Sequence, residues 1–179
     1  MRQPEQVFER ATALYESHAP AVLMYLLRQL GSREEAEDIL LEVFTLVLEK
    51  GRTLLGDERA TRAWLLTVAR NKMVDHYRRA GRLARVPLAE VEAQLYAAEE
   101  REPEQALLRQ EAATQLQAQV QQLAPAQQEV VYLRFAEGLR CGEIAQVLGK
   151  SEKATRALLY RALKQLRSFY LHKQAERGQ

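Results

Sequence analysis

Along most of the chain, apolar side chains recur at the spacing that places them on one face of an α-helix. One such stretch, "PEQVFERATALYESHA", is followed by a second, "AVLMYLLRQL", which comes after Pro20 and stops at Gly31. Proline fits the first turn of a helix but disrupts its interior. The pattern therefore predicts two helices before residue 31, the second beginning at Pro20.

A further helix is predicted over "REEAEDILLEVFTLVLEK", up to Gly51. Ser32 and Glu35 have the spacing of a capping box at its start, and the acidic first turns suit the positive end of the helix dipole. Its apolar residues span a wide arc, which predicts contact with more than one neighbouring helix. They include Ala36, Ile39, Leu40, Val43, Phe44, Val47 and Leu48.

The loop "GRTLLGDERA", which carries Leu54 and Leu55, precedes a long predicted helix, "TRAWLLTVARNKMVDHYRRAGR". Thr61 lies near its expected start. One side of this helix is expected to hold Trp64, Leu65, Val68, Ala69, Lys72 and Met73. Together the four helices up to about Arg79 are expected to form one small bundle.

The helical pattern is then interrupted by a glycine, two prolines and a run of small and acidic residues. We expect a flexible acidic linker over residues 82–108, between an N-terminal domain (1–81) and a C-terminal domain (109–179). The second domain resumes with "EQALLRQEAATQLQAQVQQLA" and "AQQEVVYLRFAEG". A short helix, "GEIAQVLG", a turn at Gly149-Lys150 and a longer helix then predict a helix-turn-helix. No tract indicates a strand, so the predicted fold class is all-α.

Charge is distributed unevenly, although the net charge of the 179 residues is only +2. Residues 62–85 carry seven basic residues and one acidic residue, and residues 145–179 carry eight basic and two acidic residues. Residues 88–111, between them, carry seven acidic and two basic residues. Two basic blocks around an acidic middle favour two polyanion-binding surfaces joined by a connector. Solvated charged faces would explain any one block about as well.

Catalytic chemistry is not indicated by the sequence. The three histidines are scattered, and neither a glycine-rich phosphate loop nor an HExxH motif is present. Adjacent Asp75 and His76 would point to different sides of a helix. The single cysteine, Cys141, excludes an internal disulfide and a CxxC zinc site. We expect no enzyme activity, no cofactor and no metal, and, without a signal peptide or apolar membrane span, a cytoplasmic location.

The last predicted helix has two distinct faces. Thr155, Leu159, Ala162, Leu166 and Phe169 form an expected inward stripe, with Leu158 at its edge. The opposite side is basic with one tyrosine, a composition suited to a DNA major groove, although a solvated basic helix is the plain alternative. Its residues are Lys153, Ala157, Tyr160 and Lys164, flanked by Arg156 and Arg161.

Two N-terminal motifs, "EEAEDILLEVF" and "AWLLTVARNKMVDHYRR", carry a resemblance to a known family. With "LAPAQQEVVYLRFAEGL", "GEIAQVLG" and "YRALKQLR" following in order, the chain resembles the extracytoplasmic-function group of bacterial RNA polymerase sigma factors. The resemblance covers roughly Phe8–Arg79 and Leu123–Arg167. It implies binding to core RNA polymerase, recognition of the −35 and −10 promoter elements, DNA melting, and control by an anti-sigma protein.

The resemblance also implies roles for individual residues. The −10 element would be engaged by Asn71, Asp75, Arg78 and Arg79, with Leu54 and Leu55 in the loop that captures an unpaired base. The −35 duplex would be read by Ser151, Lys153, Arg156, Ala157, Tyr160, Arg161 and Lys164. The polymerase would be contacted by Glu37, Asp38, Glu42, Val43 and Phe44, although Val43 and Phe44 also have the spacing of core residues. Asp75 would alternatively orient Arg78 or Arg79 by an ion pair.

Several positions depart from the usual pattern of the family. Leu41 stands where a glutamine is frequent, and Arg140 and Cys141 replace the usual serine-plus-aromatic pair. Two other interpretations stay open from the sequence. One is a helix-turn-helix transcriptional regulator with an N-terminal regulatory or dimerisation module; the other is a helical interaction protein with merely solvated basic faces. Basic residues on the N-terminal long helix favour the sigma-factor interpretation over both.

Overall fold

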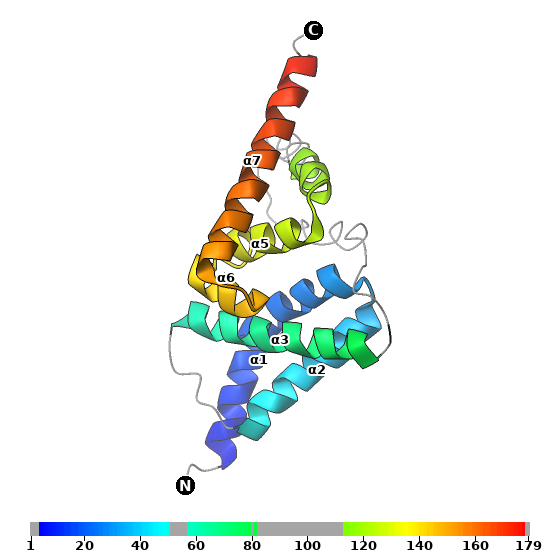
Figure 1. The fold of residues 1–179 in the computed structure, drawn as a ribbon. Helices are drawn as coiled ribbons and strands as arrows, with labels where there is room; N and C mark the ends of the chain where they lie inside the picture. Colours follow the sequence, from blue (N-terminus) through cyan, green and yellow to red (C-terminus); the bar gives the residue numbers. More distant parts are fainter. Residues whose placement is uncertain (1–3, 51–56, 80, 82–112, 178–179) are drawn as a thin grey trace, which may run out of the picture. The chain divides into compact units, whose positions relative to one another are not determined.

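The computed structural model describes residues 4–50, 57–79, 81 and 113–177, and all regular structure within these ranges is helical (Figure 1). The all-α prediction is therefore confirmed for the described residues. The helices are α1 (Pro4–Leu30), α2 (Arg33–Lys50), α3 (Glu58–Arg79), α5 (Pro125–Phe135), α6 (Cys141–Leu148) and α7 (Glu152–Arg177), with residues 113–121 also helical. The predicted linker lies outside these ranges, as do Leu54 and Leu55.

The chain divides into two compact units, one of residues 1–91 with 145–150 and the other of residues 92–144 with 151–179. In the first unit, α1, α2 and α3 all contact one another. In the second, α5 packs against α7.

Residues 4–30 form one continuous helix, so the prediction that Pro20 begins a new helix is wrong. Pro20 is exposed, whereas Ala19 before it and Val22 and Tyr25 after it are buried. An interior proline costs a helix about 3 kcal/mol, because it removes a backbone hydrogen bond and crowds the preceding turn. Packing of α1 against both α2 and α3 outweighs that cost.

The start of α2 follows the predicted capping signal. Gly31 adopts a left-handed conformation (φ 69°), which suits a residue without a Cβ at the end of α1. The Ser32 hydroxyl then accepts a hydrogen bond from the Glu35 backbone N–H at 3.3 Å. This contact satisfies one of the unpaired donors at the helix start and is the predicted N-cap.

The core of the first unit lies where the three helices meet. From α1 and α2 it includes Val22, Tyr25, Leu26, Ile39, Leu40, Val43, Phe44 and Val47. From α3 it includes Thr61, Ala63, Leu65, Leu66, Ala69, Met73 and Tyr77, so α3 is buried on more than one side. Trp64, expected on the same side of the helix as Leu65 and Met73, is only half-buried.

In the second unit, α5 begins at Pro125, the position in a helix where proline is best tolerated. The Gln127 side-chain oxygen accepts the Ala124 backbone N–H at 3.0 Å. After α5 the chain turns at Gly138 (φ 67°), and the Arg134 guanidinium donates to the Leu139 carbonyl at 2.9 Å. These contacts fix the turn that leads into the helix-turn-helix.

Candidate nucleic-acid interface

The C-terminal end of α3 presents a polar stripe to solvent. Asn71, Asp75 and Arg78 follow the helical spacing that places them on one side, and all three are exposed, as is the adjacent Arg79. Between these positions, Met73 and Tyr77 are buried, as is Ala69 just before them. We call Asn71, Asp75, Arg78 and Arg79 the α3 stripe. The structure thus brings together the predicted −10 residues of this helix.

Asp75 organises the two arginines of the α3 stripe in different ways. Its carboxylate lies 3.7 Å from Arg78 Nη1, whereas its backbone carbonyl accepts a hydrogen bond from Arg79 Nε at 3.3 Å. Of the two ion pairs considered from the sequence, the structure therefore has the one with Arg78. The Arg78 guanidinium remains largely in solvent, so the pair orients a side chain more than it stabilises the fold.

Contacts to α1 and α2 fix the opposite side of this helix end. Lys72 pairs with Glu42 of α2 at 2.9 Å, and His76 Nε2 lies 3.5 Å from a Glu35 oxygen. The Tyr77 hydroxyl donates to the Gln29 carbonyl at the end of α1, at 3.0 Å. These three pairings join residues distant along the chain, so no local sequence pattern predicts them. They hold the backbone that carries the α3 stripe.

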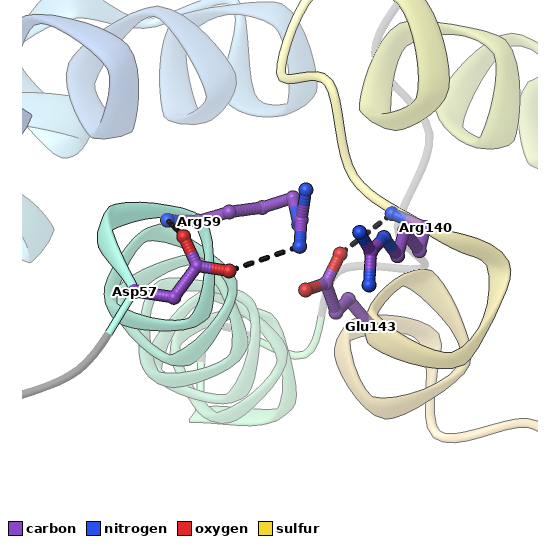
Figure 2. A network of polar contacts seen from close by, with 4 residues as sticks. All are labelled: Asp57, Arg59, Arg140 and Glu143. Atoms are coloured by element: carbon purple, nitrogen blue, oxygen red, sulfur yellow. Dashed lines mark hydrogen bonds and ion pairs between the residues drawn. The ribbon is translucent and has the colours of Figure 1, made fainter.

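The N-terminus of α3 is capped by Asp57 rather than by the region of Thr61. Asp57 Oδ1 accepts the Arg59 backbone N–H at 3.3 Å, and its other oxygen pairs with the Arg59 guanidinium at 2.9 Å (Figure 2). Asp is among the preferred N-cap residues, so this signal was available in "GDERA". The helix consequently begins at Glu58.

The predicted polymerase-contact residues divide into two groups. Asp38 is exposed and Glu37 and Glu42 are partly so, but Val43 and Phe44 are buried. Phe44 packs edge-to-face against Tyr15 with 4.9 Å between ring centroids. Apolar side chains inside a folded bundle cannot offer a surface to a partner. The assignment of Val43 and Phe44 to polymerase contact is therefore wrong, and both residues belong to the core.

Beside these carboxylates, α2 carries a shallow open depression, which we call the α2 depression. It is lined by Asp38, Leu41, Glu42, Thr45, Leu46, Glu49 and Lys72. Leu41, the position where the family often has glutamine, is 60% exposed here. The depression therefore combines an exposed apolar side chain with an acidic surround.

At the start of α6, Glu143 supplies a capping hydrogen bond to the backbone of Arg140, the residue before the helix. Glu143 Oε2 accepts the Arg140 backbone N–H at 2.6 Å (Figure 2), and the Arg140 carbonyl accepts the Ile144 N–H at 2.9 Å. This is the glutamate half of a capping box. The unusual Arg140-Cys141 pair noted in the sequence therefore leaves this helix start hydrogen-bonded.

The predicted turn between α6 and α7 is present. Gly149 has φ 62°, and the Lys150 N–H bonds to the Ala145 carbonyl at 2.9 Å, as in a glycine-terminated helix end. Ser151 then caps α7, its hydroxyl accepting the Ala154 N–H at 3.2 Å. The Ser151 hydroxyl therefore has a structural role as the N-cap of α7, in addition to the predicted DNA contact.

The two predicted faces of α7 are only partly as expected. Thr155 and Ala162 are buried, whereas Leu159, Leu166 and Phe169 are half-buried. The opposite side, which we call the α7 outer face, is exposed throughout and consists of Lys153, Arg156, Ala157, Tyr160, Arg161 and Lys164. Arg161 Nε donates to the Ala157 carbonyl at 3.3 Å, and Arg156 pairs with Glu152.

Other kinds of site are not found in the described ranges. No group of at least three His, Cys, Asp or Glu residues there could hold a metal ion. No helix in those ranges is long and apolar enough to cross a bilayer. His18 is buried in the first unit; burial, followed by the nearby charge of Arg62, lowers its pKa below 6.5, and Glu58 opposes the shift.

Comparisons with known proteins match both units. Residues 14–83 match Sigma-70 region 2, and residues 113–166 match Sigma-70 region 4. The ECF RNA polymerase sigma factor SigL of Mycobacterium tuberculosis is 30% identical over 164 residues, covering 87% of this chain and 85% of SigL. The chain belongs to the ECF sigma factors. The resemblance inferred from the sequence motifs is thereby confirmed.

A second ECF sigma factor and one solved structure are also similar to this chain. BldN of Streptomyces coelicolor is 37% identical over 154 residues, which are 86% of this chain but only 57% of the length of BldN. A solved structure of CnrH in complex with the cytosolic domain of CnrY has a similar fold. It matches with a TM-score of 0.54 and 23% identity, over 93% of this chain and 94% of the matched chain.

Proposed function

We propose that this chain is a promoter-specificity subunit of bacterial RNA polymerase. In this proposal the chain binds core polymerase, its α7 outer face reads the −35 duplex, and its α3 stripe engages the −10 element as the strands separate. The carrying observation is the exposure of Asn71, Asp75 and Arg78 on one side of α3, within the region 2 match. A regulator that uses only the helix-turn-helix has no need for this second polar surface.

Promoter melting in this proposal is a shift of an existing equilibrium. An unpaired strand held by the first unit would bias a duplex that opens transiently, so the chain itself needs no catalytic group. Asn71 offers an amide that can donate to and accept from a base edge, while Arg78 and Arg79 suit phosphates. Leu54 and Leu55 remain proposed for the loop that captures an unpaired base.

The major-groove role of α7 rests on the shape and charge of its outer face. A helix fits the major groove, and this one exposes Lys153, Arg156, Arg161 and Lys164 along one side. Ala157 and Tyr160 lie among these basic residues and are suited to apolar contact with a thymine methyl group. In this assignment the basic residues set affinity and position, and the remaining side chains contribute to sequence preference.

Polymerase docking is assigned to α2. Glu37, Asp38 and Glu42 provide carboxylates for basic partner residues, and Leu41 in the α2 depression provides an apolar contact. Lys72 already pairs with Glu42, so it limits the charge that Glu42 presents. A charged rim around an apolar centre is the usual arrangement of a protein interface.

We also propose an anti-sigma protein as a regulatory partner, because such partners are common in the family to which the chain belongs. The place of action that follows from this function is the cytoplasm, where polymerase and chromosome meet. No cofactor is required by any step of this function.

Run-off transcription tests the function. The chain would be added to bacterial core RNA polymerase with a library of promoter fragments, and transcript 5′ ends would be sequenced. We expect transcripts that start at a fixed distance from a shared two-part motif and that vanish without the chain. If the chain binds DNA yet directs no transcript from any fragment, the helix-turn-helix regulator becomes the better assignment.

A further inference from the structure

The first turn of α7 carries an acidic residue, Glu152, beside the α7 outer face. Its Oε1 atom forms an ion pair with Arg156 Nη2, one helical turn further along, at 2.5 Å. Side-chain exposure is 49% for Glu152 and 69% for Arg156, so water screens the pair. Exposed pairs of this kind add little to folding stability. The consequence of the contact is therefore the direction it gives to the guanidinium.

The second oxygen of the same carboxylate faces a different helix. A Cβ built on Gly142, in the first turn of α6, would lie 3.6 Å from Glu152 Oε2. Glu152 thus lies between the start of α6 and Arg156 of α7. Its charge also suits the positive N-terminal ends of both helices. One oxygen of the carboxylate therefore pairs with Arg156, and the other lies beside the first turn of α6.

A restrained arginine matters when the ligand is a base edge. Guanine presents two acceptors, O6 and N7, in the major groove, and arginine binds them with two N–H groups in a fixed plane. Giving one N–H to Glu152 leaves the guanidinium with further donors. Arginine loses much side-chain freedom on binding, so an arginine that is already oriented loses less.

We propose that Glu152 is a positioning residue that holds Arg156 for a guanine in the duplex promoter element. Because this rests on the function proposed above, it concerns specificity at one base pair rather than binding as a whole. Glu152 acts through Arg156, and removing either residue weakens the preference at the same position.

The test uses the full chain bound to core polymerase and a linear duplex library with a randomised window. Bound DNA is sequenced to give the base preference at each position. We expect the wild type to select a motif with a preferred guanine, and Glu152→Gln and Arg156→Ala each to reduce that preference about tenfold, within the range for one bidentate contact. The double variant should be no worse than Arg156→Ala, since the two residues act as one unit.

Three further variants separate positioning from charge and from folding. Glu58→Gln removes the same kind of carboxylate from the exposed Arg62–Glu58 pair of α3 and should leave every position unchanged. Gly142→Ala should keep the guanine preference, because 3.6 Å is an ordinary contact distance. Gly142→Leu should displace the carboxylate and reproduce the effect of Glu152→Gln.

Each remaining outcome overturns the proposal in a recognisable way. An unchanged guanine preference in Glu152→Gln, with a changed one in Arg156→Ala, rejects the positioning role and leaves the sigma-factor function intact. A uniform change at all positions indicates bulk charge or altered folding instead. Failure of the wild type to select any motif contradicts the proposed function itself, and the role of Glu152 with it.

Discussion

The two basic helices of this chain, α3 and α7, carry their exposed arginines on very different supports. α3 is buried on more than one side, and the exposed residues of its C-terminal half form a narrow stripe. In α7, only Thr155 and Ala162 are fully buried among the residues whose side chains are described. A helix end held by a core suits the capture of a strand at one place, whereas a long open face suits the groove of a duplex.

The first way to test this comparison is to remove one leucine from each helix. Leu66 in α3 is fully buried, so Leu66→Ala should lower the free energy of unfolding of the first unit by about 3 kcal/mol. Leu163 in α7 is 40% exposed, and Leu163→Ala should cost less than about 1 kcal/mol. Urea unfolding followed by the fluorescence of Trp64, the only tryptophan, reports the first unit, and circular dichroism reports both. Equal losses would show that α7 is supported as firmly as α3.

The second test concerns the α3 stripe. Replacing Arg78 and Arg79 together by Ala should reduce open-complex formation strongly, because two phosphate-binding groups are removed. Each single-strand phosphate that is no longer neutralised should flatten the dependence of log affinity on log salt by about 0.7. Permanganate reactivity of unpaired thymines measures the melting, and co-purification measures polymerase binding, which should persist. Loss of polymerase binding instead would mean that the two surfaces are misassigned.

The third test concerns the α7 outer face. Lys153→Ala with Arg161→Ala should weaken binding of the holoenzyme to −35 duplex and flatten the salt dependence by about 0.9 for each duplex phosphate that is no longer neutralised. The control is Arg33→Ala, which removes a basic residue that pairs with Glu37 within α2. Its salt dependence should equal that of the wild type. A slope that does not differ between the two variants would argue against this face as the duplex-binding surface.

Local signals in the sequence predicted much of this arrangement. The Ser32 cap, the turn at Gly149 and the exposed side of α7 depend on neighbouring residues, so pattern and turn chemistry were sufficient. Pro20 was misjudged, because the packing that outweighs its cost comes from α2 and α3. Val43 and Phe44 had the spacing of core residues, and the family resemblance did not distinguish their structural role from a binding one.

Pairings between distant residues could not be predicted in the same way. Lys72–Glu42 and Tyr77–Gln29 depend on how α3 crosses its neighbours, which no local pattern encodes. The choice of Arg78 rather than Arg79 as the ion-pair partner of Asp75 depends on side-chain rotamers, because both spacings are allowed on a helix. For this chain, local signals predicted the exposed polar faces, whereas the tertiary contacts that hold α3 had to come from the structure.

The smallest expected effect is a dependence on pH of the stability of the first unit, which the α7 outer face should not share. Burial, and then the charge of Arg62, lower the pKa of His18 in α1 below its ordinary 6.5, while Glu58 raises it. Below pH 6.5 the unfolded chain therefore binds a proton at His18 that the folded first unit does not bind. The free energy of unfolding consequently decreases as the pH is lowered, until the pH reaches the lowered pKa of the folded state. Above pH 6.5 His18 is neutral in both states and this contribution is constant.

His18→Leu replaces the imidazole by an apolar side chain of similar size in α1 and removes this titration. We expect urea unfolding of the wild type, followed by Trp64, to occur at lower urea at pH 5.5 than at pH 7.5, and the difference to shrink in the variant. Binding of −35 duplex by α7 should show no such dependence on His18, because that contact belongs to the other unit. If both proteins lose the same stability between pH 7.5 and pH 5.5, the buried imidazole of His18 is not the source of the acid sensitivity.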